Sequence, residues 1–453
     1  MASSHDLIII GAGSAGLGAA RNAAISGAKP LLITYGPIGG DCTWTGCVPS
    51  KALIAQSKQG RPFSEAIATV HEAIEQVASA ETADVLRGEG IEVAEGRARL
   101  AAPEEVIIGE SRFRAKHIVI ATGSRASVPP IPGLADVDYI TNEKLFELTE
   151  LPPRLGIIGA GAIGCEMALA FAGFGSTVSL FEGADRVLPI EEPDASEVIE
   201  RAMATAGVTV HTGSFVENVS QAATGIDVTV NGITTTVDTL LVAAGRSPNT
   251  EGLGIEELGL EMTSRGHIKV DEKLATSINS IRAAGDVTGL LPFTHSADEQ
   301  ARMAVAHALG LKSKWKYDAS TTPWVTFTTP EVARVGVTEK DAPAGARVAH
   351  FPLHNVDRAI TEGRTDGFVK LIAGPKTITR NAFGGQIVGA TIVADRAGEM
   401  IHGPTLAARL GMFVGRLAQV TVPYPTWTTA VQQAAGMFFQ PVHGLEARPA
   451  KKN

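Results

Sequence analysis

Two closely spaced cysteines are the residues of this chain best suited to chemistry. Cys42 and Cys47 lie in the segment GGDCTWTGCVPSKAL at 39–53, and the 453 residues include only one further cysteine, Cys165. Three cysteines cannot form a disulfide framework, and in a reducing compartment a close pair is more often catalytic or metal-binding than structural. A tetrahedral zinc site needs four ligands, and no second cysteine pair or histidine cluster is present to supply them. The pair therefore indicates thiol chemistry without a bound metal. The alternative is two thiols that happen to be neighbours, and Cys165 is expected to be inert packing.

Two glycine-rich turns of one pattern predict two nucleotide sites. The segments DLIIIGAGSAG at 6–16 and RLGIIGAGAIG at 154–164 each run from a short apolar strand through G-x-G-x-x-G into an alanine-rich helix. The first glycine allows the sharp turn, the second lets the backbone approach a pyrophosphate, and the third lets the helix pack on the strand. One such turn is weak evidence, because any tight glycine turn can match, but two in matching contexts are much stronger. The glycines concerned are Gly11, Gly13, Gly16, Gly159, Gly161 and Gly164.

The two modules differ in the acidic residue that usually binds a ribose hydroxyl about 20 residues after the glycine turn. The first module has Thr34 at that place, which can still form a hydrogen bond, and the second has Glu182. A carboxylate accepts from the 2′-hydroxyl of NADH and repels the 2′-phosphate of NADPH, so NADH is favoured there. Arg186, four residues on, keeps NADPH possible.

The elements that position these residues form two related α/β modules, with the second inserted into the first. Each module has a later apolar strand that ends in a turn, HIVIATGS at 117–124 and TLLVAAGRSPN at 239–249. The segment SIRAAGDVTG at 280–289 follows the second module and is expected to return the chain to the first. From about Thr322 the sequence contains alternating strand-like stretches, which are followed by alanine-rich helical segments at 396–415 and 426–437. This pattern predicts an α+β domain. The polar tail after Pro441 is expected to be frayed.

The segment around the cysteines resembles the pyridine nucleotide-disulfide oxidoreductases, the family of dihydrolipoamide dehydrogenase, glutathione reductase and mercuric reductase. The resemblance covers nearly the whole chain and keeps the order of the motifs. It implies an α/β fold with two Rossmann-like dinucleotide-binding domains, for FAD and NAD(P), and a C-terminal α+β dimerisation domain. The expected boundaries are 1–148 for the first part of the FAD domain, 149–272 for the NAD(P) domain, 273–321 for the second part of the FAD domain and 322–453 for the interface domain.

The resemblance also implies roles for individual residues. Cys42 and Cys47 would form a disulfide beside the flavin, with Cys47 facing the ring and Cys42 exchanging with substrate. Five positions exceed one helical turn, so a bridge needs a distorted helix start, for which Gly46 and Pro49 are suited. A helix N-terminus would also lower a thiol pKa, which a nucleophile needs.

Further roles follow from matching positions. Lys51 and Glu166 would form an ion pair near flavin N5, where a cation stabilises negative charge on the reduced ring. Asp286 would bind the ribityl chain of FAD; by itself it would be just a turn aspartate. The expected cofactor-binding set comprises the six glycines of the two turns with Thr34, Gly40, Asp41, Lys51, Thr122, Gly123, Glu182, Gly245, Arg246 and Asp286.

The chain departs from its family at the acid/base pair. Dihydrolipoamide dehydrogenase and glutathione reductase carry H-P-T-x-x-E in the partner subunit, whereas this chain has Tyr424 for the histidine and Thr429 for the glutamate. A phenol with an ordinary pKa near 10 is a poor base at neutral pH but can donate a proton. Tyr424 is therefore a candidate catalytic residue, with packing as the alternative. No other histidine offers an evident replacement, including His295, His354, His402 and His443.

Composition excludes several partners. The 39 Lys and Arg against 48 Asp and Glu give a formal charge of −9 without a basic block, so no nucleic acid is expected. The apolar runs are strand-length, far short of the roughly 20 residues that span a bilayer. The first ten residues lack a basic leader, so we expect a cytoplasmic protein, and the family resemblance implies a homodimer.

Three functions remain open from the sequence. The first is an NAD(P)H-dependent flavoprotein that reduces a small or protein disulfide through Cys42 and Cys47. The second is a metal-ion reductase of the mercuric type, although the cysteine pair that such enzymes carry near the C-terminus is missing. The third is a quinone reductase or oxidase in which the flavin passes electrons directly, so that activity survives loss of both cysteines.

Overall fold

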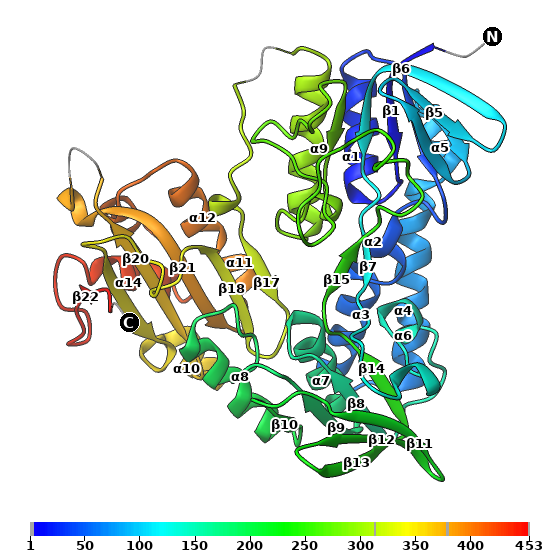
Figure 1. Cartoon of the computed structure of the whole chain (residues 1–453). Helices are drawn as coiled ribbons and strands as arrows, with labels where there is room; N and C mark the ends of the chain where they lie inside the picture. The colour runs from blue at the N-terminus through cyan, green and yellow to red at the C-terminus, as the bar shows by residue number, and fades with distance from the viewer. Residues whose placement is uncertain (1–3, 312–313, 377–379, 452–453) are drawn as a thin grey trace. The chain divides into compact units, whose positions relative to one another are not determined.

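The computed structural model describes residues 4–311, 314–376 and 380–451, coloured along the chain in Figure 1. The chain divides into two compact units. The first comprises 1–129, 140–150 and 244–319, and the second comprises 130–139, 151–243 and 320–453. The four-part domain division expected from the sequence stays a prediction.

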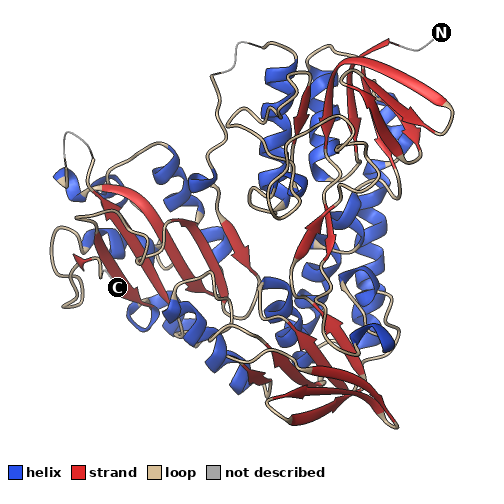
Figure 2. Ribbon diagram, in the orientation of Figure 1, coloured by secondary structure: helices blue, strands red, loops and turns tan. Residues whose placement is uncertain are grey.

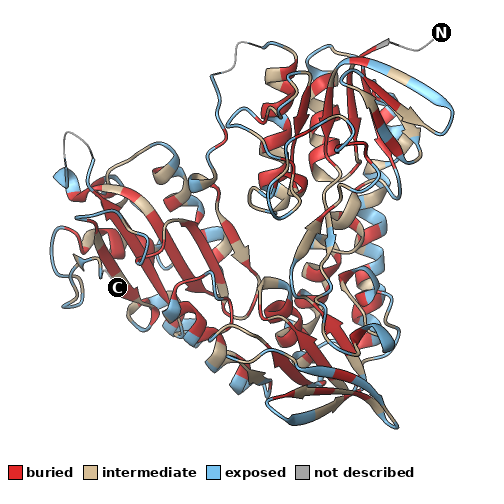
Figure 3. Cartoon of the chain, in the orientation of Figure 1, coloured by how far each residue is buried: buried red, intermediate tan, exposed pale blue. Residues whose placement is uncertain are grey.

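The first unit is built on a parallel sheet with the strand order β3-β2-β1-β6. Its strands are β1 (Ser4–Ile10), β2 (Pro30–Thr34), β3 (Glu92–Glu95) and β6 (Ser111–Ile120). Alternate residues of β1 point to opposite faces: Leu7 and Ile9 lie in the core under helix α1 (Ser14–Ile25), and Ile8 and Ile10 lie in the core of the other face. Both faces are buried, as parallel sheets require (Figure 3).

The chain returns to this sheet late, as expected. Strand β16 (Ile281–Ala283) pairs in parallel with β6, and helix α9 (Thr294–Ala308) packs beside α1 (Figure 1). Strand β6 also pairs with the antiparallel hairpin of β4 (Ala98–Ala102) and β5 (Glu105–Ile108), and a small ribbon joins β7 (Ser124–Ala126) to β15 (Arg246–Pro248). The helices of this unit that remain are α2 (Gly40–Trp44), α3 (Cys47–Lys58), α4 (Phe63–Ala78), α5 (Ala83–Gly88) and α6 (Asn142–Leu145).

The second unit contains the second module and the C-terminal segment. Its parallel sheet has the order β10-β9-β8-β14 and is joined by an antiparallel sheet β11-β12-β13. The bounds are β8 (Arg154–Ile158), β9 (Thr177–Phe181), β10 (Thr209–His211), β11 (Asn218–Ala222), β12 (Gly225–Val230), β13 (Ile233–Val237) and β14 (Thr239–Val242). Helix α7 (Ala162–Phe174) follows the glycine turn, and α8 (Pro193–Thr205) precedes β10.

The C-terminal segment forms an antiparallel sheet with helices, as predicted from about Thr322 (Figure 2). The sheet has the order β17-β18-β21-β20-β19-β22, with β17 (Trp324–Thr326), β18 (Glu331–Gly336), β19 (Arg347–Pro352), β20 (Phe368–Gly374), β21 (Gln386–Ala394) and β22 (Arg448–Pro449). The helices are short: α10 (Asp357–Glu362), α11 (Ala397–Met400), α12 (His402–Arg409), α13 (Val414–Gln419) and α14 (Thr429–Gly436).

The expectation of a frayed tail after Pro441 is wrong up to Lys451. Strand β22 pairs with β19, Arg448 forms an ion pair with Glu339, and the backbone N–H of Lys451 donates to Glu339 at 2.9 Å. Polar composition misled the prediction, because hydrogen bonds and an ion pair hold the tail, and its few apolar residues, among them Val442 and Leu445, pack against the core.

The α/β fold class is confirmed. Within the part of the chain that the structure describes, no helix combines the length and the apolar character needed to cross a membrane.

Candidate active site

The two cysteines lie on either side of a break between helices. Cys42 is in the short helix α2, and Cys47 is the first residue of α3. Gly46 interrupts the two with φ −129° and ψ −110°, and a Cβ there would lie 2.7 Å from the carbonyl oxygen of Asp41. Pro49 sits in the first turn of α3, where its missing N–H costs nothing. The expected distortion is therefore present, and it follows mainly from Gly46.

The two thiols have different surroundings. Cys42 is half-buried and Cys47 is exposed. Cys47 Sγ lies 3.3 Å from Thr294 Oγ1, on the first residue of α9. The pKa of Cys42 is raised above its usual range, first because it is hydrogen-bonded to Cys47 and second because it is buried, and Thr294 and Ser14 only partly oppose this. The expected lowering of a thiol pKa thus does not hold for Cys42, while Cys47 occupies the helix N-terminus.

A polar network connects the cysteine helix to the β7–β15 ribbon. Arg246 forms an ion pair with Asp41, and its Nε donates to Ser124 Oγ at 2.7 Å. Ser124 Oγ in turn donates to Asp286 Oδ2 at 2.6 Å. Three residues expected to bind the cofactor, Asp41, Arg246 and Asp286, therefore come together although they are far apart in the chain.

Three further residues expected to bind the cofactor directly precede the two strands of this ribbon: Thr122 and Gly123 before β7, and Gly245 before β15. Thr122 Oγ1 donates to the carbonyl oxygen of Asn249 at 2.7 Å, so this hydrogen bond connects the residues before β7 with the residue after β15. Gly123 and Gly245 have φ of +68° and +124°, a region that favours glycine.

The first glycine turn has the shape that a pyrophosphate needs. A Cβ on Gly11 would lie 2.3 Å from the Ala121 carbonyl oxygen, and one on Gly16 would lie 1.8 Å from the Gly11 carbonyl oxygen, so both glycines are required for packing. Gly13 is different, because the nearest atom to its Cβ would be Gly40 Cα at 3.9 Å. The N-terminus of α1, which Gly13 precedes, has no side-chain cap, so its N–H groups are available to an anion. These residues fit a dinucleotide.

Thr34 does not replace the missing carboxylate well. Its side chain is only 5% exposed, and its hydroxyl donates to the carbonyl oxygen of Gly36 at 2.8 Å. The hydroxyl proton is therefore used within the turn that follows β2.

The second glycine turn repeats the first. A Cβ on Gly164 would lie 1.8 Å from the Gly159 carbonyl oxygen, whereas a Cβ on Gly161 would meet nothing within 4 Å. Glu182 follows β9, and its carboxylate accepts from the backbone N–H groups of Ala160 at 2.7 Å and Ala184 at 2.9 Å. A negative charge is thus fixed beside the glycine turn, and this turn also fits a dinucleotide.

Comparison with known proteins identifies the family. Residues 5–308 match the model of the pyridine nucleotide-disulphide oxidoreductases, and residues 322–435 match the dimerisation domain of the same family. The chain belongs to the pyridine nucleotide-disulphide oxidoreductases. Members of this family use FAD and NAD(P)H, so the chain is an NAD(P)H-dependent flavoprotein disulfide oxidoreductase, and its dimerisation domain supports a homodimer.

Several relatives of this oxidoreductase are similar over nearly their whole length. A mercuric reductase of Staphylococcus aureus is 33% identical, with 97% of this chain and 84% of the relative covered. A dihydrolipoyl dehydrogenase of Geobacillus stearothermophilus is also 33% identical, with 97% of each covered. Among solved structures, a Cu(II) complex of the HOCl-induced flavoprotein disulfide reductase RclA from Escherichia coli has a TM-score of 0.88 at 30% identity, with 96% of this chain and 99% of that chain covered.

Lys51 and Glu166 lie in different compact units of this oxidoreductase. Lys51 Nζ donates to Ser50 Oγ at 3.3 Å on α3. Glu166, on α7, is 4% exposed and accepts from the backbone N–H of Phe327 at 2.9 Å. The ion pair between Lys51 and Glu166 stays a prediction.

Tyr424 lies on the surface of the second unit. Its ring is 74% exposed, and its hydroxyl donates to Asp357 Oδ2 at 2.8 Å. This hydrogen bond to a carboxylate raises the pKa of Tyr424, because ionisation would place two negative charges side by side. The phenol of Tyr424 therefore stays protonated at neutral pH, and its catalytic role stays a prediction. Thr429 begins α14 and does not provide a carboxylate.

Four contacts of these site residues were missed from the sequence. They involve Ser14 and Thr294 beside the cysteines, Ser124 in the polar network, and Asp357 beside Tyr424. Single serines, threonines and aspartates carry no spacing signal, so no pattern pointed to them.

Cys165, His295 and His350 each have contacts that sequence spacing did not predict. Cys165 is fully buried, its thiol donates to the Ala160 carbonyl at 3.2 Å, and burial raises its pKa. His295 stacks on Phe293 with 5.7 Å between ring centroids. His350 lies 3.3 Å from Asp194, a carboxylate partner that sequence spacing did not reveal.

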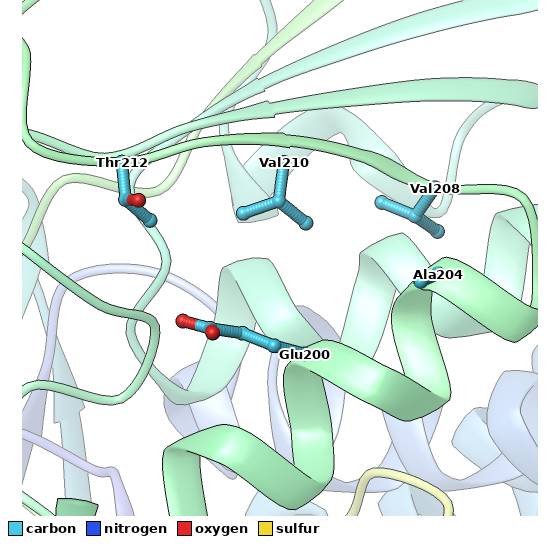
Figure 4. A pocket seen from close by; sticks show the side chains of 5 residues that line it. All are labelled: Glu200, Ala204, Val208, Val210 and Thr212. Carbon is cyan, nitrogen blue, oxygen red and sulfur yellow. The ribbon is translucent and has the colours of Figure 1, made fainter.

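A hollow of about 260 Å³ lies between α8 and the segment at 208–212 in the second module (Figure 4). It is lined by Glu200, Ala204, Val208, Val210 and Thr212. None of the predicted site residues lines it, so we do not associate it with the reaction.

Proposed function

We propose that the chain takes electrons from NADH and delivers them through the Cys42–Cys47 disulfide to a thiol-disulfide acceptor, as a cytoplasmic homodimer. The observation that carries the proposal is the hydrogen-bonded thiol pair at the α2–α3 break, with its unequal exposure and the raised pKa of Cys42. The acceptor class follows from the family and from the chemistry of the pair.

We assign FAD to the first module and NADH to the second. The first glycine turn, Gly40, Asp41 and Asp286 would hold FAD, with Thr122, Gly123, Gly245 and Arg246 shaping the same site. FAD supplies the two-electron link between the nicotinamide and the cysteine pair when it is bound. Lys51, paired with Glu166, would place a positive charge near the flavin.

NADH is preferred to NADPH because of Glu182. Its fixed carboxylate accepts a hydrogen bond from a ribose hydroxyl and repels a 2′-phosphate. Arg186, the residue that could bind a 2′-phosphate, instead donates to the backbone carbonyls of Pro189 at 2.9 Å and Glu191 at 3.3 Å.

The dithiol reaction uses the two cysteines in sequence. The Cys42 thiolate attacks one sulfur of the acceptor disulfide, so that a Cys42–acceptor disulfide forms and the first acceptor thiolate leaves. Cys47 then attacks Cys42 Sγ, which forms the Cys42–Cys47 disulfide and releases the second acceptor thiolate. The acceptor is reduced by two electrons, the pair is oxidised by two, and the two protons that the cysteine thiols give up convert the leaving thiolates to thiols. Tyr424 is a candidate for passing on one of these protons.

Anaerobic titration with NADH tests the proposal. At two electrons the wild type is expected to develop a long-wavelength absorption band from a Cys47 thiolate beside the flavin. Cys47→Ser should abolish the band, and Cys42→Ser should abolish NADH-dependent reduction of an aromatic disulfide such as dithiobis(nitrobenzoate). Cys165→Ser is the matched control and should behave as wild type. If NADH oxidation by the acceptor survives loss of both Cys42 and Cys47, the flavin passes electrons directly and the quinone reductase or oxidase hypothesis replaces this one.

A metal-ion reductase is the second candidate. The observation that favours it is Tyr424 and Thr429 in place of the family's histidine and glutamate, together with mercuric reductases among the relatives and a structural neighbour described as a Cu(II) complex. Two adjacent thiolates suit a soft metal ion as substrate. The chain has no cysteine after Cys165, so Cys42 and Cys47 would have to take the metal directly.

Steady-state assays separate the two candidates. NADH oxidation stimulated by Hg²⁺ or Cu²⁺ in the presence of excess thiol, and lost in Cys42→Ser, would support metal reduction. Stimulation by disulfides alone would support the first proposal.

A further inference from the structure

The first module lacks a carboxylate where a dinucleotide-binding sheet normally supplies one. Thr34 ends β2, it is 5% exposed, and its hydroxyl proton is committed to the Gly36 carbonyl. The 2′-hydroxyl of the adenosine ribose of FAD therefore needs an acceptor from elsewhere.

The neighbouring strand has a carboxylate directly beside Thr34. Strand β3 runs parallel to β2, and Glu95, its last residue, pairs in register with Thr34. The backbone N–H of Gly96 donates to the Thr34 carbonyl at 2.8 Å, which fixes the two strand ends side by side. Both residues lie at the carboxyl ends of parallel strands, where dinucleotides bind in such sheets.

The Glu95 side chain also points to the correct face. Side chains alternate along a strand, so Glu95 shares a face with Val93, and Thr34 shares one with Leu32. Leu32 and Val93 both pack into the core that contains Ala15 and Ala19 of α1. Glu95 therefore lies on the face covered by α1, the helix whose N-terminus is open to the pyrophosphate.

The Glu95 carboxylate is available for a ligand. Glu95 is exposed, and within the described ranges its carboxylate forms no hydrogen bond or ion pair. The turns after β2 and β3 also lie together, because the Arg97 guanidinium sits 5.8 Å from the ring centroid of Tyr35.

We propose that Glu95 is the ribose-binding carboxylate of the FAD site, supplied by β3 in place of the residue that β2 lacks. The proposal rests on the assignment of FAD to the first module. It makes the adenosine end of FAD depend on a strand that follows the cysteine helices in the chain.

Release of FAD from the diluted holoprotein, followed by flavin fluorescence, tests the proposal. Because a hydrogen bond to a charged group is lost, Glu95→Gln should raise the Kd for FAD roughly ten- to one-hundredfold. Glu110→Gln is the matched control, since Glu110 is an equally exposed glutamate on the β5–β6 hairpin of the same unit, and its Kd should equal that of wild type. Thr34→Glu added to Glu95→Gln should recover much of the affinity.

Two further measurements make the outcome specific. After reconstitution with FAD that lacks the adenosine 2′-hydroxyl, wild type and Glu95→Gln should bind equally well. An unchanged Kd for normal FAD in Glu95→Gln, with thermal stability retained, would overturn the proposal. If Glu95→Gln instead weakens binding of NAD⁺ and leaves FAD unaffected, the assignment of the two modules is reversed and the proposed function is wrong at that point.

Discussion

The two active-site cysteines are chemically unequal although they are only five positions apart. Cys47 begins a helix and is exposed, whereas Cys42 is half-buried and retains its proton through the hydrogen bond to Cys47. The raised pKa keeps Cys42 protonated in the reduced pair until it gives up its proton to attack an acceptor. The asymmetry arises from the helix break at Gly46 rather than from the cysteines themselves.

Removal of Cys47 should therefore make Cys42 more acidic. The hydrogen bond to Cys47 is the largest cause of the raised pKa, so Cys47→Ala is expected to lower it, while burial still holds it above the ordinary value. At a pH below the pKa, each unit of lowering raises the thiolate fraction about tenfold. The alkylation rate of Cys42 by iodoacetamide in the reduced protein, measured between pH 6 and 10, should rise at pH 8, by about tenfold for each unit by which the pKa falls.

The control for this experiment is the third cysteine. Cys165 is buried, so Cys165→Ser should leave the alkylation profile unchanged. An identical pH profile for Cys42 in wild type and Cys47→Ala would contradict the assigned cause.

In the proposed function, Glu182 sets the choice of nicotinamide cofactor. Glu182→Gln removes the charge but keeps an acceptor for a backbone N–H, so the turn should remain folded. We expect kcat/KM for NADPH relative to NADH to rise on the order of tenfold, because repulsion of the 2′-phosphate is lost. Steady-state kinetics with both cofactors would measure this, and a ratio equal to that of wild type would exclude Glu182 as the determinant.

At the scale of elements, the glycine turns show why spacing is informative. In each turn the third glycine packs directly against the carbonyl group of the first, whereas a methyl group on the middle glycine would have room: its nearest neighbour would be Gly40 Cα at 3.9 Å for Gly13, and nothing within 4 Å for Gly161. The first and third glycines are thus needed for packing, whereas the middle glycine is needed for the approach of the ligand. A substitution of the middle glycine can therefore test binding without disturbing the fold.

Substitutions in the second turn should separate folding from binding. Gly161→Ala has room for its methyl group, so the protein should fold normally and bind NADH at least tenfold more weakly, since the methyl occupies the cradle. Gly164→Ala would press against the Gly159 carbonyl and should fail to fold or melt much earlier. Thermal melts and NAD⁺ titrations of both variants provide the test. Equal loss of stability in the two would show that the middle glycine is also structural.

Prediction from the sequence succeeded where a local pattern carries the information. The strand-turn-helix modules, the late return of β16 and the break at Gly46 all follow from short-range chemistry of glycine and apolar residues. The Asp41–Arg246–Ser124–Asp286 network did not, because its members lie up to 245 positions apart, from Asp41 to Asp286, and only the fold brings them together. The prediction of a frayed tail failed for the same reason, because Arg448 forms its ion pair with Glu339, which is distant in the sequence.

A buried ion network connects the second module to the C-terminal sheet within one unit. Lys370, on β20, is 4% exposed and lies 3.2 Å from Glu192 and 2.7 Å from Asp194. Nearby, Arg334 on β18 lies 2.8 Å from Glu191. Although burial alone would raise it, the pKa of Asp194 is lowered by His350 and Lys370. These ion pairs hold the segment from Glu191 to Asp194, at the start of α8, against the C-terminal sheet.

Loss of Lys370 should weaken this unit strongly. Lys370→Met leaves buried carboxylates without a compensating cation, which costs about 3–5 kcal/mol of unfolding free energy. Denaturant unfolding is the measurement. Lys269→Met is the control, because the Lys269–Glu261 pair is solvent-exposed and its loss should be undetectable. If both variants unfold like wild type, the buried pairs are energetically neutral.

At the scale of the whole molecule, the two compact units should respond to different ligands. A ligand stabilises only the state that binds it, by about 2.7 kcal/mol at one hundred times its Kd. Binding of NAD⁺ to the holoprotein should therefore slow hydrogen exchange at residues 159–164 and 182–186, whereas removal of FAD should speed it at 11–16, 40–47 and 92–97. Because each set of segments lies in a different unit, hydrogen exchange with mass spectrometry can resolve them. Protection of 11–16 by NAD⁺ in place of 159–164 would mean that the two glycine turns hold the opposite nucleotides, and the roles assigned here to Glu95 and Glu182 would exchange with them.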